Sequence, residues 1–291
     1  MNYKKLSMTV AAASAIFLAA CNDESSNTDK SLGDQLDYKI NGIEPGSGTM
    51  GLAHNTLEEY GLDDWKLTES STASMLIELD EAISREEPII ITGWNPHWMF
   101  DKYDLKYLED PKETFGGVEN IHTFVRKGFG QDFPGVYKIV DAFEWTSGDM
   151  EKVMSDALTS NFDEASAAWV EQNKDKVEQW TKDVPKGNGE EIKLISTPWE
   201  SEDASANVMK QILEQHGYTV KITPVDPAIM FQAIATGEGD VSLAPWLPAT
   251  HASFYEKHKD SFVDLGANLE GARIGLVVPT YMDIDSIEDL K

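Results

Sequence analysis

Two stretches of the chain follow the same order of expected elements, and each ends on a tryptophan that is followed two positions later by proline. The first runs from GIEPGSG (42–48) to IIITGWNPH (89–97), and the second from LISTPWE (194–200) to VSLAPWLPATH (241–251). Each predicts strand, turn, helix, strand, helix and strand. A duplicated α/β unit predicts two similar lobes, and the strand ends of such sheets line crevices where ligands bind.

Apolar periodicity and turn residues place the individual elements. In the first copy we expect strands 39–43, 65–69 and 88–92 with helices 49–60 and 71–86; in the second, strands 191–196, 218–223 and 240–245 with helices 201–216, 227–235 and 250–258, followed by strand 273–278. Segments 103–108 and 121–126 look extended, and 133–182 is helical. Its tryptophans, Trp145, Trp169 and Trp180, sit where an amphipathic helix buries its core side.

The first twenty residues have the pattern of a lipoprotein signal peptide. Lys4 and Lys5 precede an apolar run that ends in Leu18-Ala19-Ala20-Cys21. A basic start, a short apolar stretch and small residues before the cut are typical of a secretory signal, here 1–20. Cys21 is the only cysteine in the chain. We expect it to carry the lipid, which leaves no cysteine for a disulfide.

Residues 21–38 are expected to form a lipidated, flexible tether, because polar, charged sequence of this kind buries too little apolar surface to fold. The protein would then be anchored at the extracytoplasmic face of the cell membrane without spanning it. We assign 39–124, together with 280–291, to lobe 1, and 125–279 to lobe 2.

The charge is strongly acidic: 24 basic and 51 acidic residues give a formal net charge of −27. This balance argues against nucleic acid as a partner, since phosphate backbones attract lysine and arginine. A soluble, solvated surface accounts for it. Adaptation to saline surroundings is the sharper hypothesis, because salt screens the repulsion among so many carboxylates.

The segment Gly46-Ser47-Gly48-Thr49-Met50-Gly51 has the spacing GxGxxG between a strand and a helix. A dinucleotide site is disfavoured, because NAD is a cytosolic cofactor and this chain carries an export signal. Backbone N–H groups at such a helix start can still bind a phosphate or carboxylate. A tight turn without a ligand remains the other interpretation.

Three tryptophans stand at strand ends or turns rather than inside elements: Trp94, Trp199 and Trp246. Indole faces attract a quaternary ammonium, which donates no hydrogen bonds, with about 0.5–2 kcal/mol per ring. Three rings fall short of the roughly 8 kcal/mol of micromolar binding, so a second anchor is needed. His251 is either an ordinary surface histidine or a donor to an anionic group at the other end of the ligand.

Sequence signatures of common enzymes are missing: the chain has no GxSxG, HExxH, paired CxxC or P-loop motif. The six histidines are scattered, and we expect neither a metal nor a cofactor. An extracytoplasmic carbohydrate-active enzyme that stacks its substrate on tryptophans and uses carboxylates for catalysis stays as the alternative function. A structural or adhesive lipoprotein is a further one.

Taken together, these motifs resemble the glycine betaine-binding lipoproteins of OpuA-type ABC transporters. The resemblance extends over essentially the whole chain. It is carried by LAAC (18–21), GIEPGSG, IIITGWNPHWMF (89–100), YLEDP (107–111), RKGF (126–129), AIATG (233–237), LAPWLPATH (243–251) and SIEDL (286–290).

The resemblance implies a two-lobed α/β fold of the periplasmic-binding-protein type, type II-like and permuted, with the ligand cleft between the lobes. It implies an aromatic cage made by Trp94, Trp199 and Trp246. The backbone amides of Gly48 and Thr49, with His251, would hold the ligand's carboxylate. The partners implied are glycine betaine or a similar betaine and an ABC permease with its ATPase, and the protein would act as a monomer without enzymatic activity. Closure is expected from hinges near 121–127 and 275–281.

Overall fold

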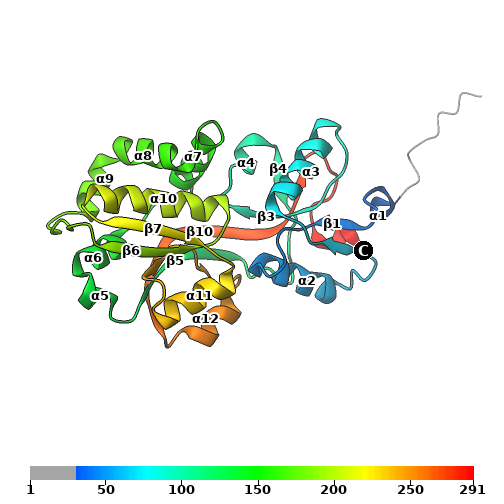
Figure 1. Ribbon diagram of the computed structural model, residues 1–291. Helices are drawn as coiled ribbons and strands as arrows, with labels where there is room; N and C mark the ends of the chain where they lie inside the picture. Colours follow the sequence, from blue (N-terminus) through cyan, green and yellow to red (C-terminus); the bar gives the residue numbers. More distant parts are fainter. Residues whose placement is uncertain (1–30) are drawn as a thin grey trace, which may run out of the picture.

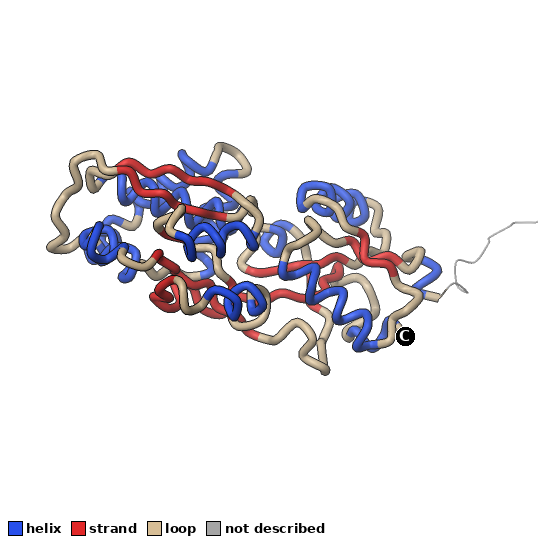
Figure 2. The backbone as a smooth tube through the Cα atoms, turned by 60° about the horizontal axis from the view of Figure 1, so that its bottom comes forward, coloured by secondary structure: helices blue, strands red, loops and turns tan. Residues whose placement is uncertain are grey.

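The computed structural model describes residues 31–291, and these form two lobes of α/β structure (Figure 1). The predicted signal peptide and Cys21 lie outside the described residues. Figure 2 shows the same two bodies after a rotation, with the C-terminus in the smaller one. No helix between residues 31 and 291 combines the length and apolarity needed to cross a membrane.

Lobe 1 holds the first copy of the repeat and the C-terminus. Its elements are α1 (Leu32–Gln35), β1 (Lys39–Asn41), α2 (Gly48–Tyr60), β2 (Lys66–Thr68), α3 (Thr72–Ser84), β3 (Ile91–Asn95), α4 (Met99–Lys102), β4 (Leu105–Tyr107) and the 3-10 helix η1 (Ile287–Leu290). In Figure 1, α3 lies above the strands and α2 below them, so helices cover both faces of this part of the sheet.

Lobe 2 holds the helical segment and the second copy. Its elements are α5 (Phe129–Asp132), α6 (Pro134–Ala142), α7 (Ser147–Ala157), α8 (Phe162–Gln172), α9 (Lys174–Trp180), β6 (Glu191–Ser196), α10 (Glu200–Gln215), β7 (Thr219–Pro224), α11 (Pro227–Thr236), β8 (Val241–Ser242), β9 (Trp246–Leu247) and α12 (Ala252–His258).

Two antiparallel strands join the lobes: β5 (Val118–Arg126) and β10 (Phe262–Pro279). The hydrogen-bonded strand order is β2-β1-β3-β10-β5-β8-β6-β7. At Arg273, β10 still pairs with Val118 of β5 and begins to pair with Asn95 of β3. The strand, coloured orange in Figure 1, thus passes from the sheet of one lobe into that of the other.

The repeat predicted from the sequence is present in the strand order. In lobe 1, β1 lies between β2 and β3 and is parallel to both. In lobe 2, β6 lies between β7 and β8 with the same parallel pairing. The X-Pro bonds after the two strand-end tryptophans, Asn95–Pro96 and Leu247–Pro248, are both cis. The duplicated α/β unit is therefore confirmed.

The predicted core tryptophans of the helical segment are confirmed as core. Trp145, Trp169 and Trp180 are buried, and their rings contact one another edge-on or stacked. Thr146 begins α7 with a capping box, in which Thr146 accepts from the backbone of Asp149 and Asp149 accepts from the backbone of Thr146. This cap fixes the start of α7, directly after the buried Trp145.

Three strands differ from their predicted ranges. The apolar run 88–92 forms a strand only from Ile91, and that strand continues through Trp94 to Asn95. The second-copy strand expected over 240–245 is reduced to β8, and Trp246 belongs to a separate short strand, β9. The strand expected at 273–278 is the end of the much longer β10, whose register shifts three times against β5.

The boundaries of the folded body also differ from the expected ranges. Helix α1 and the buried side chain of Leu36 lie within 21–38, where we expected a tether. Tyr38, which follows, packs edge-on against Trp65, so this end of the segment has apolar surface to bury. At the other boundary, residues 273–279 pair with β3 and β4 of lobe 1, although we placed them in lobe 2.

Candidate functional site

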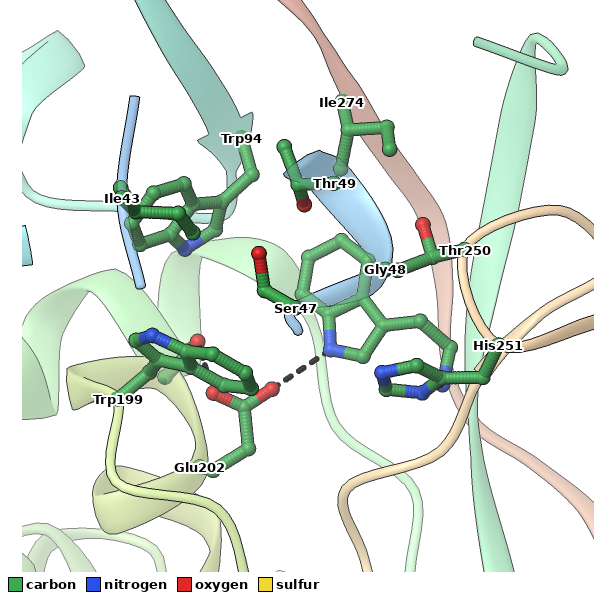
Figure 3. Close-up of a pocket in the computed structure, with 12 residues that line it drawn as sticks. Ile43, Ser47, Gly48, Thr49, Trp94, Trp199, Glu202, Thr250, His251 and Ile274 are labelled. Atoms are coloured by element: carbon green, nitrogen blue, oxygen red, sulfur yellow. Dashed lines mark hydrogen bonds between the residues drawn. The ribbon is translucent and has the colours of Figure 1, made fainter. Parts of the chain in front are cut away.

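A cavity lies between the two lobes, and all six predicted site residues line it (Figure 3). Its lining residues from lobe 1 and β10 are Ile43, Ser47, Gly48, Thr49, Trp94 and Ile274, and those from lobe 2 are Trp199, Ser201, Glu202, Trp246, Thr250 and His251. In Figure 3, Trp94 and Trp199 lie on one side of the cavity and Gly48, Thr250 and His251 on the other. The contact of these residues with a ligand stays a prediction.

Trp94 is held at the end of β3 by His97. The two rings meet edge-on, with centroids 4.8 Å apart. The Met99 backbone N–H donates to His97 Nδ1 at 3.2 Å, so the neutral imidazole carries its proton on Nε2. That nitrogen lies 3.7 Å from a carboxylate oxygen of Glu200, which belongs to lobe 2. His97, which contacts the ring of Trp94, therefore also faces Glu200 of the other lobe.

Trp199 precedes α10 and is tied across the lobe interface by Glu44. Its indole Nε1–H donates to Glu44 Oε2 at 3.0 Å. The same carboxylate accepts from the backbone N–H and the hydroxyl of Thr72, each at 2.8 Å. Burial raises the pKa of Glu44, but these hydrogen bonds outweigh it and hold that pKa below its usual value. Glu44 is therefore an ionised acceptor for the Trp199 indole.

Trp246 lies in β9 and is fixed from two sides. Its indole Nε1–H donates to Glu202 Oε1 at 2.6 Å, the bond drawn as a dashed line in Figure 3. Its backbone N–H donates to His251 Nδ1 at 3.0 Å. Two of the three tryptophans thus have their polar edge bound by a carboxylate.

His251 is neutral and presents a defined donor. The residue is 2% exposed, and burial lowers the pKa of its imidazole to about 3. Because Nδ1 accepts from Trp246, the ring proton resides on Nε2. The interpretation of His251 as an ordinary surface histidine is wrong, because the side chain is buried beside the cavity. A neutral Nε2–H can donate a hydrogen bond to an anionic oxygen.

The start of α2 supplies further donors beside the cavity. The Ser47 hydroxyl accepts from the backbone N–H of Met50 at 3.3 Å and caps the helix. Between residues 31 and 291, the backbone N–H groups of Gly48 and Thr49 have no hydrogen-bond acceptor in the protein. Unpaired N–H groups at a helix start, together with the helix dipole, favour an anion.

Gly48 is also a point of close approach between the lobes. A Cβ atom added at Gly48 would lie 2.1 Å from the carbonyl oxygen of Thr250. Gly48 belongs to lobe 1 and Thr250 to the turn before α12, so only a residue without a side chain lets the lobes meet here. Glu119 of β5 holds that turn by accepting from the backbone N–H groups of Ala249 and Thr250 at 2.6 and 2.7 Å.

Sequence reasoning missed three residues of the site: Glu44, His97 and Glu202. Each of the three contacts one of the tryptophans. None of them is a strand-end residue of the repeated pattern from which the site was predicted. Glu202 stands in the acidic run Glu200-Ser201-Glu202-Asp203, and in a chain with 51 acidic residues no local signal singles it out. Between residues 31 and 291, no group of three or more His, Cys, Asp or Glu side chains is arranged to hold a metal ion.

The fold and the cavity define the class of the protein: two similar α/β lobes with a cavity between them that is lined by aromatic side chains. Residues 19–172 and 190–291 match the family model described as the substrate binding domain of ABC-type glycine betaine transport systems. The chain therefore belongs to this family of transporter substrate-binding domains.

A relative of known name is 46% identical to the chain. It is the glycine betaine/carnitine transport binding protein GbuC of Listeria monocytogenes, and the alignment covers 99% of this chain and 98% of the relative. An uncharacterised protein of Chromohalobacter salexigens is 28% identical over 34% of this chain and 66% of its own length. The near-complete alignment with the Listeria protein agrees with the resemblance inferred from the motifs.

Solved structures of related proteins align over about half of the chain. Lactococcal OpuAC in its closed form with glycine betaine is 46% identical over 54% of this chain and 64% of its own, with a TM-score of 0.49. A choline-binding protein of an ABC transporter, in complex with choline, is 28% identical over 52% of this chain and 57% of its own, with a TM-score of 0.45. These alignments span less than two thirds of either solved chain.

Proposed function

We propose that this protein is the extracytoplasmic substrate-binding protein of an ABC importer and captures glycine betaine and related quaternary-ammonium osmoprotectants. One observation carries the proposal. Three indoles from two lobes line the same cavity as the free N–H groups of Gly48 and Thr49 and the neutral imidazole of His251. This arrangement matches a small molecule with a methylated cation at one end and a carboxylate at the other.

The two halves of the site contribute different interactions. The trimethylammonium group contacts the negative faces of Trp94, Trp199 and Trp246, which together contribute about 2–6 kcal/mol. Micromolar affinity requires about 8 kcal/mol, so the remainder comes from the carboxylate end. There the two backbone amides and the His251 Nε2–H donate charge-assisted hydrogen bonds.

Binding is coupled to closure of the lobes. Trp94 and the α2 amides belong to lobe 1, whereas Trp199, Trp246 and His251 belong to lobe 2. Only the closed arrangement brings all of them to one ligand, so the ligand favours that state. We place the hinge where the strands pass between the lobes, near Val118 and Arg273, a few residues from the ranges 121–127 and 275–281 predicted from the sequence.

Delivery completes the proposed cycle. The lipid on Cys21 tethers the binding protein to the outer face of the cell membrane, and the monomer passes its solute to a membrane permease powered by a cytoplasmic ATPase. The protein itself changes no covalent bond of the ligand. Nothing in the comparisons supports the carbohydrate-active alternative.

Isothermal titration calorimetry of residues 22–291 with glycine betaine tests the proposal. We expect one site per chain, with micromolar or tighter affinity, and recovery of the betaine unchanged after denaturing the complex. Choline has the same cation but no carboxylate, so it should bind at least tenfold more weakly. Absence of betaine binding would contradict the proposal, and a chemically altered ligand would contradict the non-enzymatic role.

A further inference from the structure

Glu202 is a buried acid at the wall of the cavity. It is the third residue of α10, is only 3% exposed, and lines the cavity beside Trp199 (Figure 3). A carboxylate in such a place loses its hydration and must be compensated by hydrogen bonds or by an opposite charge. The partners of Glu202 in the protein therefore indicate whether its charge is balanced.

The protein supplies hydrogen bonds to Glu202 but no cation. Oε1 accepts the indole N–H of Trp246 and Oε2 accepts the hydroxyl of Ser201, each at 2.6 Å. The position in the first turn of α10 adds the favourable dipole of a helix start. Within the described part of the chain, no Lys, Arg or His forms an ion pair with Glu202. Within residues 31–291 the carboxylate therefore has no cationic side chain as a partner, and it lines the cavity.

We propose that Glu202 is a specificity-determining residue, whose negative charge selects ligands with a cationic head group and takes the bound onium as its counter-ion. This inference rests on the proposed function and sharpens it. Indole faces and methyl groups also attract each other through dispersion, which a neutral tert-butyl group would share. Cation–π attraction already favours the cation over a neutral group of the same shape. The charge of Glu202 adds to this preference.

The acid–base behaviour of the site is consistent with this role. Burial raises the pKa of Glu202 to about 7, so in the empty protein the carboxyl is partly protonated near neutral pH. A cation bound nearby favours the charged form, so binding releases a proton below about pH 7 and the affinity for a cation rises with pH.

Five other ionisable groups lie on the elements that surround the cavity. They are Glu200 and Asp203 on α10, Glu44 and His97 from lobe 1, and His251 from the turn before α12. Burial, reinforced by the charge of Glu200, raises the pKa of Asp203 to about 6, so Asp203 adds to the pH dependence at its acidic end. His251, with its pKa lowered to about 3 by burial, stays neutral throughout.

The test compares two ligands in wild type and in the variant Glu202→Gln. Glycine betaine and 3,3-dimethylbutanoate share shape and carboxylate, but the second has a carbon in place of the ammonium nitrogen. Glutamine still accepts the Trp246 N–H through its carbonyl oxygen, so the ring stays in place. We expect calorimetry to show betaine affinity falling about 10- to 100-fold in Glu202→Gln, the scale of one charge at about 5 Å in a partly buried site. The affinity for 3,3-dimethylbutanoate should stay within about threefold.

Asp203→Asn is the matched control, because it removes a neighbouring acid that does not line the cavity. It should weaken betaine binding much less than Glu202→Gln does. An equal loss for both ligands in Glu202→Gln would mean that Glu202 only positions the ring of Trp246, and would overturn the proposal. Unchanged betaine affinity would overturn it as well. Failure of the wild-type protein to bind betaine would instead refute the proposed function.

A second measurement covers the case in which Glu202→Gln does not fold. In wild type, the ratio of betaine affinity to 3,3-dimethylbutanoate affinity should rise between pH 5.5 and pH 8, because only the cation benefits from ionised Glu202. The carboxyl of 3,3-dimethylbutanoate is partly protonated near pH 5.5, but this would raise the ratio at low pH, which is opposite to the predicted trend. A ratio that does not change with pH would contradict the inference.

Discussion

At the scale of single residues, the cage depends on what holds the edges of its rings. Trp199 and Trp246 donate their indole N–H groups to Glu44 and Glu202. These bonds fix the orientation of each ring, and an ionised acceptor such as Glu44 polarises the indole so that its face becomes more negative. In the proposed cage, these carboxylates would strengthen the attraction between the rings and a bound cation.

Replacing Trp246 tests the contribution of one ring. Trp246→Ala should weaken glycine betaine binding about tenfold or more, the roughly 1.4 kcal/mol expected of one desolvated indole. Trp246→Phe keeps an aromatic face but loses the bond to Glu202, so its affinity should fall between that of wild type and that of Trp246→Ala. Calorimetry measures both, and wild-type affinity in Trp246→Ala would remove this ring from the site.

The buried acid Glu202 also makes the stability of the empty protein depend on pH. Burial raises its pKa from 4.5 to about 7, so the folded state binds more protons than the unfolded state between these values, and stability falls as the pH rises through them. His251 has the opposite effect: its pKa is lowered from 6.5 to about 3, so stability falls as the pH drops below 6.5.

Glu202→Gln removes the first effect and leaves the second. The free energy of unfolding of the variant, relative to wild type, should therefore increase by about 1–3 kcal/mol between pH 5 and pH 8. Urea unfolding of the ligand-free proteins at the two pH values measures this difference. If the difference between variant and wild type is the same at pH 5 and pH 8, Glu202 is not protonated as described.

At the scale of elements, the start of α2 meets the turn before α12. Gly48 and Thr49 line the cavity, and Gly48 brings no side chain against Thr250, where an added Cβ would collide with the backbone. The carboxylate of Glu119 holds the opposing turn by accepting hydrogen bonds from the backbone N–H groups of Ala249 and Thr250. Glu119, a residue of the strand β5 that joins the lobes, thus fixes the turn that Gly48 approaches.

Two alanine substitutions in the same helix separate closure from helix stability. Gly48→Ala should weaken betaine binding at least about tenfold, or roughly 1.4 kcal/mol, because its Cβ would collide with Thr250 when the lobes close. Gly51 is exposed, and a Cβ there meets nothing within 4 Å. Gly51→Ala should therefore keep its affinity and gain about 0.5–1 kcal/mol of stability. Equal affinities for the two variants, measured by calorimetry, would contradict the contact.

The elements show what sequence reasoning could and could not predict. The order of elements in the repeated units was predicted correctly because most strands and helices have their own apolar pattern, although the strands expected at 88–92 and 240–245 have other bounds. The first part of β10, 262–272, was missed because it contains Gly266 and Gly271, several polar residues and shifts of register, so no regular alternation is visible. Glu202 was missed for a related reason: its function depends on burial beneath Trp246, which comes from tertiary packing.

At the scale of the whole molecule, the acidic net charge affects the stability of the folded state. With a net charge of −27, carboxylates on both lobes repel one another over the length that solvent ions leave unscreened. The ion pairs of the described surface are mostly exposed and individually contribute little. Folding of the empty protein should therefore depend on the ionic strength of the solution.

Thermal unfolding at different salt concentrations tests this expectation. Between 10 and 150 mM NaCl the screening length falls from about 30 to 8 Å, so the melting temperature should rise by about 2–4 °C or more. KCl should act like NaCl, because screening depends on charge and not on the identity of the ion. A melting temperature that does not respond to either salt would contradict adaptation to saline surroundings.

If the three indoles and the donors of Gly48, Thr49 and His251 act on one ligand, tryptophan fluorescence reports on binding directly, because the proposed cage consists of indoles. We predict a saturable change of emission with micromolar glycine betaine, and a change with choline only at concentrations at least tenfold higher. No response to glycine betaine, or equal responses to both compounds, would contradict the account.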